Sequence, residues 1–113
     1  MPTLFSKIIS KEIPATILHE DDDCIAFADI HPQAPVHLLI VPRKEIATVN
    51  DVQREDAELI GKLFLVAKSL AKKFGVDETG YRLVINCNDD GGQTVKHLHI
   101  HLLGGRKLGW PPG

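Results

Sequence analysis

The chain has 113 residues, of which 43% are hydrophobic and 25% charged, and this composition and length predict one globular domain over residues 1–113. Its 13 basic and 15 acidic residues leave a net charge of −2, which argues against a protein that binds nucleic acid polymers through their phosphates. The N-terminus lacks a signal-peptide pattern, and no apolar run approaches the ~18 residues of a membrane span. The two cysteines indicate no disulfide framework. We therefore expect a soluble, cytoplasmic protein without a membrane partner.

The first half of the chain predicts a short helix followed by three strands. Apolar residues within 3–9 are spaced for one helical stripe, and a proline at position 14 stops any continuation. Residues 17–20 and 24–29 flank a run of three aspartates and suit a hairpin. After a proline-stiffened loop, residues 37–41 are typical of a buried strand that ends at a proline.

The second half predicts one long helix and two further strands. Apolar residues recur at intervals of three and four from about residue 51 to residue 74, and Gly75 is placed to end this helix. Residues 81–87 and 99–103 are strand-like and are separated by a polar, glycine-rich loop over 88–94. Because most strand connections are too short for parallel crossovers, the pattern predicts an α+β fold with a mainly antiparallel sheet.

Three of the six histidines, His97, His99 and His101, fall within five positions. Side chains alternate between the two faces of a strand, so we expect the three imidazoles to form one row, backed by the apolar residues between them. Each ring carries polar nitrogens that need partners, so packing alone explains such a cluster poorly. Function is therefore expected here.

Two chemistries suit a row of imidazoles. Histidines at this spacing can present nitrogens to one zinc ion, as catalytic zinc sites require. Alternatively, a neutral imidazole can attack phosphorus while a neighbouring ring donates to the phosphate oxygens. The loop just before the histidines supports the second reading, because Gly91, Gly92, Gln93 and Thr94 offer backbone N–H groups and one hydroxyl to a phosphate.

The heptad His-Leu-His-Ile-His-Leu-Leu at 97–103 matches the signature of the histidine triad (HIT) superfamily, and nearly the whole chain resembles its Hint branch, the histidine-triad nucleotide-binding proteins. The further segments that carry the resemblance are 7–9, 11–15, 29–30, 32–35, 91–93, 104–106 and 110–113. The resemblance implies a HIT-like fold, in which a five-stranded sheet, one long helix and a short N-terminal helix form a subunit whose sheet continues across a homodimer.

The resemblance also implies a purine nucleoside phosphoramidase, which cleaves the P–N bond of AMP or GMP phosphoramidates such as AMP-lysine or AMP-NH2 without a metal or cofactor. It makes His99 the nucleophile that forms a nucleotidyl-histidine intermediate, and His101 a donor to a phosphate oxygen. It places His97 and His37 in an imidazole network that orients His99, and Thr94 near the leaving amine.

The nucleotide-binding residues implied by the resemblance fall into four groups. Asp29 matches the carboxylate that accepts from both ribose hydroxyls. Asn86, Gly92 and Gln93 lie on the phosphate side. The apolar walls around the purine are Phe5, Ile8, Phe27 and Ile30. Trp110 is expected to reach the active site of the partner subunit.

Two alternatives to the phosphoramidase remain open at this point. One is an interaction module in which the histidines hold zinc or a nucleotide without turnover. The other is a dinucleoside polyphosphate hydrolase, as in a neighbouring branch of the superfamily.

Overall fold

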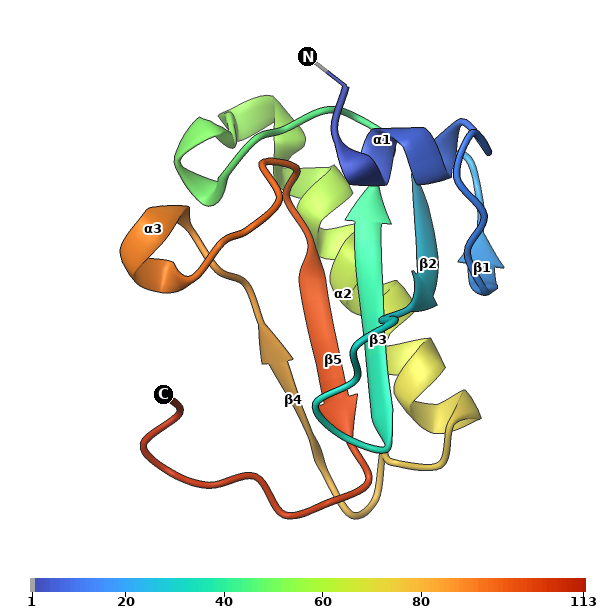
Figure 1. The fold of residues 1–113 in the computed structure, drawn as a ribbon, viewed down its shortest axis with the longest axis vertical. Helices are drawn as coiled ribbons and strands as arrows, with labels where there is room; N and C mark the ends of the chain where they lie inside the picture. Colours follow the sequence, from blue (N-terminus) through green and yellow to red (C-terminus); the bar gives the residue numbers. More distant parts are fainter. Residues whose placement is uncertain (1) are drawn as a thin grey trace.

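The computed structural model describes residues 2–113 (Figure 1). One five-stranded antiparallel sheet, in the order β1-β2-β3-β5-β4, forms the centre of the molecule and confirms the predicted α+β class. No helix among residues 2–113 is long and apolar enough to cross a bilayer. The elements, in chain order, are α1 (Leu4–Ile9), β1 (Ile17–Glu20), β2 (Cys24–Ala28), β3 (Val36–Pro42), the 3-10 turns η1 (Val49–Asp51) and η2 (Arg54–Asp56), α2 (Ala57–Lys73), β4 (Tyr81–Val84), α3 (Asn88–Gly91) and β5 (Ile100–Gly104).

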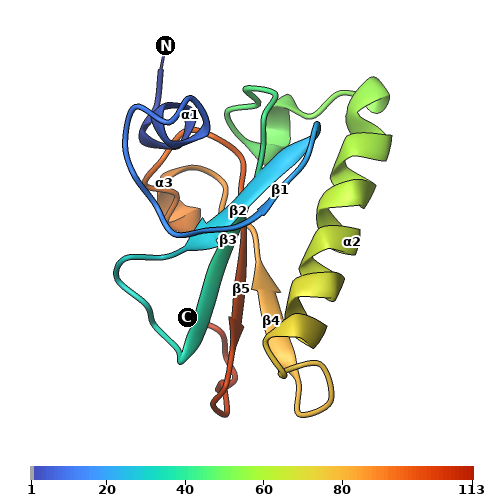
Figure 2. The same ribbon diagram turned by 90° about the vertical axis from the view of Figure 1, so that its right-hand side faces the viewer.

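The sheet separates two apolar clusters, and β2 contributes to both. Cys24 and Ala26 belong to the cluster that includes Leu63 and Ala67 of α2. The intervening β2 residues point to the other face and pack with Phe5 and Ile8 of α1. Figure 2 shows α2 running along one side of the sheet and α1 on the other. Strand β2 therefore contributes side chains both to the core under α2 and to the cluster under α1.

Helix α1 is short but has a defined start. Thr3 is its N-cap, with Oγ1 accepting from the Ser6 amide at 3.1 Å while the Thr3 amide donates to Ser6 Oγ at 2.7 Å. This reciprocal capping satisfies two of the free amides that any helix leaves at its start. Of the four residues in the predicted apolar stripe, Phe5 and Ile8 are buried, whereas Leu4 is 47% exposed.

Helix α2 begins later than predicted, at Ala57 rather than near residue 51. Residues 49–56 form two 3-10 turns instead, because acidic side chains cap the backbone there: Asp51 accepts from the Thr48 amide and Asp56 from the Gln53 amide, at 3.1 and 2.8 Å. The predicted end is confirmed, since Phe74 caps the helix and Gly75 follows with φ 73°.

The segment between β4 and β5 differs most from the prediction. The strand expected over 81–87 ends at Val84, and the predicted loop contains the one-turn helix α3. The expected strand start at His99 is also displaced to Ile100, so His97 and His99 lie before β5. Their backbone is held by other partners, since the Leu98 amide donates to the Ile46 carbonyl at 2.7 Å.

Candidate active site

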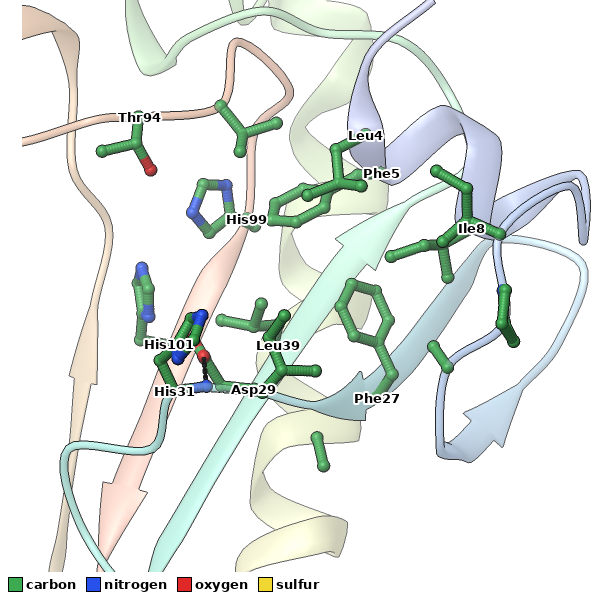
Figure 3. Close-up of a pocket in the computed structure, with 16 residues that line it drawn as sticks. Leu4, Phe5, Ile8, Phe27, Asp29, His31, Leu39, Thr94, His99 and His101 are labelled. Carbon is green, nitrogen blue, oxygen red and sulfur yellow. Dashed lines mark hydrogen bonds between the residues drawn. The ribbon is translucent and has the colours of Figure 1, made fainter.

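A cavity of about 380 Å³ opens between α1, the end of β2 and the start of β5. Its apolar side chains include Phe5, Ile8 and Phe27, whereas Asp29, His31, Thr94 and His101 gather on the opposite side (Figure 3). His99 lies between the two groups. The cavity therefore offers one apolar compartment for a flat ring and one polar compartment for hydroxyls and a charged group.

Aromatic rings in edge-to-face contact build the apolar compartment. The Phe5 ring centroid lies 5.5 Å from that of Phe27 and 4.8 Å from that of His99, with interplanar angles of 70° and 89°. Such T-shaped arrangements are favoured between aromatic rings. Phe5 thereby packs directly against His99, the expected nucleophile. Helix α1 therefore positions an apolar side chain of the cavity and its contact with His99.

His99 is held as a neutral imidazole with a defined tautomer. Its Nδ1 lies 2.7 Å from the backbone carbonyl oxygen of His97, which only accepts, so Nδ1 carries the hydrogen. Burial lowers the pKa of His99, and this shift favours the neutral ring at pH 7. In a neutral imidazole with hydrogen on Nδ1, Nε2 has a free lone pair. His99 therefore has the protonation state of a nucleophile.

Hydrogen bonds through His37 set the tautomer of His101. The Gln33 amide donates to Nδ1 of His37 at 3.0 Å, so the His37 hydrogen lies on Nε2. That nitrogen is 2.9 Å from Nδ1 of His101, which accepts from it and leaves the His101 hydrogen on its own Nε2. Burial, with His99 and His37 nearby, lowers the pKa of His101 to about 4. His101 is therefore a neutral hydrogen-bond donor at pH 7.

Asp29 connects this chain of imidazoles to the cavity. Its Oδ1 accepts from the His31 amide at 2.8 Å, which orients the carboxylate, and its Oδ2 lies 3.5 Å from Nε2 of His37. Burial lowers the pKa of His37, while the Asp29 charge opposes that shift. The carboxylate lines the cavity and can accept from a ligand.

The three triad imidazoles do not form the single row that was expected. His97 is 1% exposed and does not line the cavity; its Nε2 donates to the Pro42 carbonyl at 2.8 Å, and Thr3 Oγ1 lies 3.4 Å from its Nδ1. The expected imidazole network around His99 is also corrected, since His37 contacts His101 and the backbone of His97 holds His99. The displaced start of β5 is the reason, because the strict alternation of a strand begins only at Ile100.

The other predicted residues are distributed unevenly. Thr94 and Ile30 line the cavity, Ile30 being 81% exposed at its rim. The other cavity residues come from α1, the segment after it, β2 and the loop after it, β3, and the segment after α3; they are Leu4, Ile13, Pro14, Ala15, Ala28, His31, Leu39 and Val95. Two of them had a signal in the sequence: Leu4 belongs to the apolar stripe of α1, and His31 is close enough to Asp29 in the chain to line a ribose pocket.

Besides His37 and His97, four further predicted residues lie outside the cavity of the single chain: Asn86, Gly92, Gln93 and Trp110. Gln93 is buried and joins three backbone segments, accepting from the Asn88 amide and donating to the Ala47 and Val95 carbonyls. Gly92 ends α3 in the left-handed conformation, with φ 81°. Trp110 is 83% exposed.

The turn after β5 supports the loop that carries Gln33. Gly105 has φ 89°, and a Cβ at this position would lie 2.9 Å from Pro35, so glycine permits both the turn and the close approach. Arg106 then donates from Nε and Nη2 to the Gln33 carbonyl at 3.1 and 3.0 Å. Arg106 thus anchors the residue whose amide sets the tautomer of His37.

Comparison with known proteins gives concordant matches. The family model described as the HIT domain matches residues 10–108. The chain is 53% identical over 107 residues to the purine nucleoside phosphoramidase of Escherichia coli, covering 95% of this chain and 90% of that protein. It is 56% identical over 111 residues to an uncharacterized HIT-like protein of Synechococcus elongatus, covering 98% and 96%. The crystal structure of a HIT family hydrolase from Legionella pneumophila superposes with a TM-score of 0.97 at 56% identity, covering 99% of this chain and 100% of that one.

Proposed function

Because this chain belongs to the HIT family of hydrolases, we propose that it hydrolyses the P–N bond of AMP or GMP phosphoramidates through a nucleotidyl-His99 intermediate. One observation carries the proposal: a single cavity contains an apolar compartment, the Asp29 carboxylate and two neutral imidazoles. His99 has a free lone pair on Nε2, whereas His101 has a hydrogen on Nε2. The similarity to the Escherichia coli purine nucleoside phosphoramidase supports the choice of substrate class.

The first chemical step forms the covalent intermediate. Nε2 of His99 bonds to phosphorus as the P–N bond breaks, and the departing amine nitrogen takes up one proton from solvent through the Thr94 hydroxyl. Nε2–H of His101 donates to a non-bridging phosphate oxygen and stabilises the charge that develops there. The ring of His99 becomes cationic in this step, and the carbonyl that accepts from its Nδ1 at 2.7 Å stabilises that charge.

The second step regenerates the free imidazole. Water attacks phosphorus from the side that the amine has left, the bond from phosphorus to Nε2 breaks, and one proton is released. The balance is one phosphoramidate and one water consumed, with one nucleoside monophosphate and one amine produced. The ring nitrogen is the better leaving group while the ring is cationic, so the hydrogen on Nδ1 assists both steps.

Recognition of the nucleotide divides between the two compartments. The purine packs against Phe5, Ile8 and Phe27, with Ile30 covering it at the rim. The ribose hydroxyls donate to the Asp29 carboxylate, which is already oriented by the His31 amide. Apolar side chains contact the face of any flat purine ring, so the cavity suits both AMP and GMP derivatives, including AMP-lysine.

We also propose that the protein is a homodimer that pairs through β4. This strand is at one edge of the sheet, and the C-terminal tail runs beside it (Figure 1), tied by a hydrogen bond of 2.8 Å from Arg82 to the Gly109 carbonyl. An unpaired strand edge next to an exposed tryptophan is a surface suited to association. Pairing there continues the sheet and directs Trp110 toward the second subunit. Sedimentation of the intact chain tests this proposal, and a monomer at micromolar concentration would contradict it.

The function is tested by steady-state hydrolysis of an AMP phosphoramidate of a small amine, with EDTA present throughout. We expect turnover in the native protein, none in His99→Ala, and AMP binding in both, because the walls and Asp29 are unchanged. His19→Gln changes a partly exposed histidine on β1, away from the cavity; it is the matched control and should retain full turnover.

Two results would overturn the proposal. Full activity in His99→Ala excludes the covalent mechanism, and AMP binding without turnover in the native protein favours a recognition module. Faster cleavage of a diadenosine polyphosphate than of the phosphoramidate would instead identify a dinucleoside polyphosphate hydrolase.

A further inference from the structure

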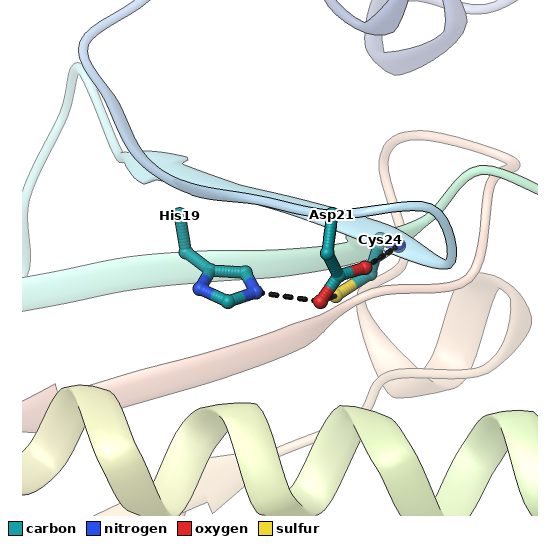
Figure 4. Close-up of side chains that lie close together, drawn as sticks. All are labelled: His19, Asp21 and Cys24. Carbon is teal, nitrogen blue, oxygen red and sulfur yellow. Dashed lines mark hydrogen bonds and ion pairs between the residues drawn. The ribbon is translucent and has the colours of Figure 1, made fainter.

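A group of side chains with metal-binding chemistry lies at the turn of the β1–β2 hairpin (Figure 4). Nε2 of His19 is 2.7 Å from Oδ2 of Asp21, and Sγ of Cys24 is 3.8 Å from the same oxygen. The three potential ligand atoms all lie within 4.8 Å of one another. Cys24 packs in the cluster under α2, so this group lies on the opposite face of the sheet from the cavity lined by Phe5 and Ile8.

The Asp21 carboxylate is oriented by the turn itself. Its Oδ1 accepts from the amides of Asp23 and Cys24 at 2.7 and 2.8 Å, which is the usual way an aspartate closes such a turn. This leaves Oδ2 as the atom that faces both His19 and Cys24. The turn is further held by Arg43, whose Nε donates to the Asp21 carbonyl at 2.7 Å. The oxygen is therefore preoriented toward the nitrogen and the sulfur.

The charges of the group favour a dication. The Asp21 carboxylate is held by hydrogen bonds from the Asp23 and Cys24 amides, and the Cys24 thiol donates to its Oδ2. A thiolate beside a carboxylate is unfavourable without a counter-charge, and a divalent cation supplies it. The same proximity that keeps the thiol protonated therefore becomes attraction once a metal is bound.

We propose that His19, Asp21 and Cys24 form a binding site for a thiophilic divalent cation such as Zn²⁺, with a fourth coordination position open to solvent. Imidazole nitrogen, carboxylate oxygen and thiolate sulfur are the three ligand types that zinc uses in proteins. With one carboxylate and one thiolate, the occupied site is electrically neutral, which suits a position where Cys24 is 0% exposed. The ion enters from the side of His19 and Asp21, whose side chains are 34% and 40% exposed.

Binding requires small rearrangements and one proton release. Zinc bonds of about 2.0–2.2 Å to nitrogen and oxygen place those atoms about 3.3 Å apart in a tetrahedral site. Nε2 of His19 and Oδ2 of Asp21 therefore separate by roughly half an ångström from their hydrogen-bonded distance. Nε2 gives up its hydrogen to expose a lone pair, so the bound imidazole carries its hydrogen on Nδ1, and the Cys24 thiol releases its proton to solvent as the metal–sulfur bond forms.

Cobalt titration tests the site directly, because Co²⁺ substitutes for zinc and gives a charge-transfer absorption band when a thiolate binds it. We expect this band at one equivalent of Co²⁺ in the chelator-stripped protein, its loss in Cys24→Ser, and its retention in Cys87→Ser, which removes the only other cysteine. Imidazole and carboxylate groups of the active site contain no sulfur, so cobalt bound there gives no such band.

A second variant, at His19, tests the site without altering the buried residue Cys24. His19→Gln changes a partly exposed residue, and we expect it to weaken cobalt binding by more than tenfold, since even partners outside a ligand set contribute about 10–100-fold. Phosphoramidate turnover should stay unchanged in His19→Gln and Cys24→Ser, because the site lies across the sheet from the cavity. Absence of the band in the native protein would overturn the proposal, as would a band that survives Cys24→Ser or an unchanged affinity in His19→Gln.

Discussion

Nε2 of His37 donates to Nδ1 of His101 across 2.9 Å, and this contact determines which nitrogen of His101 presents a hydrogen to the cavity. The direction of the bond follows from the Gln33 amide, which occupies the other nitrogen of His37. Neutral imidazole has two tautomers of similar energy, so a backbone amide outside the cavity is sufficient to select the useful one. His101 can then stabilise a phosphate oxygen without being cationic.

Replacing His37 by phenylalanine tests this selection. The ring volume is largely kept, but His101 loses its donor and is free to turn its hydrogen away from the phosphate. We expect kcat for an AMP phosphoramidate to fall by at least about tenfold and at most by the ~10²–10³ that loss of a donor to the transition state costs. AMP binding, measured by calorimetry, should be little changed. A native kcat in this variant would show that the tautomer of His101 does not matter.

Arg106 is expected to act through Gln33 as a positioning residue. Removal of its side chain in Arg106→Ala frees the loop that carries the Gln33 amide, and small displacements at a reacting group cost up to about 10²-fold in rate. We expect kcat to fall by about tenfold or more while KM changes little. Lys107→Ala is the matched control, since it removes a neighbouring exposed cation. Equal losses in both variants, or a change in KM alone, would contradict the positioning role.

The Asp29 carboxylate should determine the preference for ribose. Asp29→Asn keeps an oxygen for the His31 amide but removes the charge that accepts from two hydroxyls. A hydrogen bond to a charged group contributes about 1.5–3 kcal/mol, so kcat/KM for the ribonucleotide should fall by about tenfold or more. The 2′-deoxy substrate should lose less, because it has one hydroxyl fewer. If both substrates lose activity equally, Asp29 does not bind the ribose.

Activity should persist to acidic pH. Burial lowers the pKa of His99, so the nucleophile stays neutral below the usual histidine range. We expect kcat/KM to be level from about pH 8 to 6.5 and to decline only below that, as the ring becomes protonated. Steady-state rates across this interval provide the measurement. A decline centred above pH 6.5 would mean that His99 is not the group whose protonation limits the reaction.

Stability should also depend on these histidines, in a defined pH window. The pKa of His101 is about 4 in the folded protein, against about 6.5 when unfolded, so the unfolded chain binds more protons between these values. The free energy of unfolding should therefore decrease as the pH falls from about 6.5 to about 4, by an amount of order 1–3 kcal/mol for this group. Urea unfolding at several pH values measures the slope. His101→Asn should flatten it, and an unchanged slope would exclude His101 as its source.

Local signals in the sequence predicted much of the fold. The apolar stripe that predicts α1 lies within six consecutive positions, and Gly75 ends α2 because glycine alone adopts the positive φ there without strain. The start of α2 was not predictable in this way, because Asp51 and Asp56 cap 3-10 turns that compete with the helix. Helical periodicity does not reveal that competition.

The family resemblance names candidate site residues by their positions in the motif. It does not indicate which distant segments of the chain come into contact. Asp29 and His101, which the resemblance names for binding and catalysis, line the same cavity. Gln93 was assigned to the ligand, yet its amide group bonds to Ala47, a partner 46 positions away that no local pattern indicates. The group of His19, Asp21 and Cys24 had no signal either, because a run of aspartates is usually a solvated turn.

The brevity of α1 has a thermodynamic consequence. A helix of six residues is not stable in isolation, so α1 persists only through its cap and the packing of Phe5 and Ile8 beneath it. These are the same residues that wall the cavity. A ligand in the cavity contacts Phe5 and Ile8 only when α1 is folded, so binding should disfavour local unfolding of the helix. Amide hydrogen exchange within α1 should therefore slow when the cavity is filled.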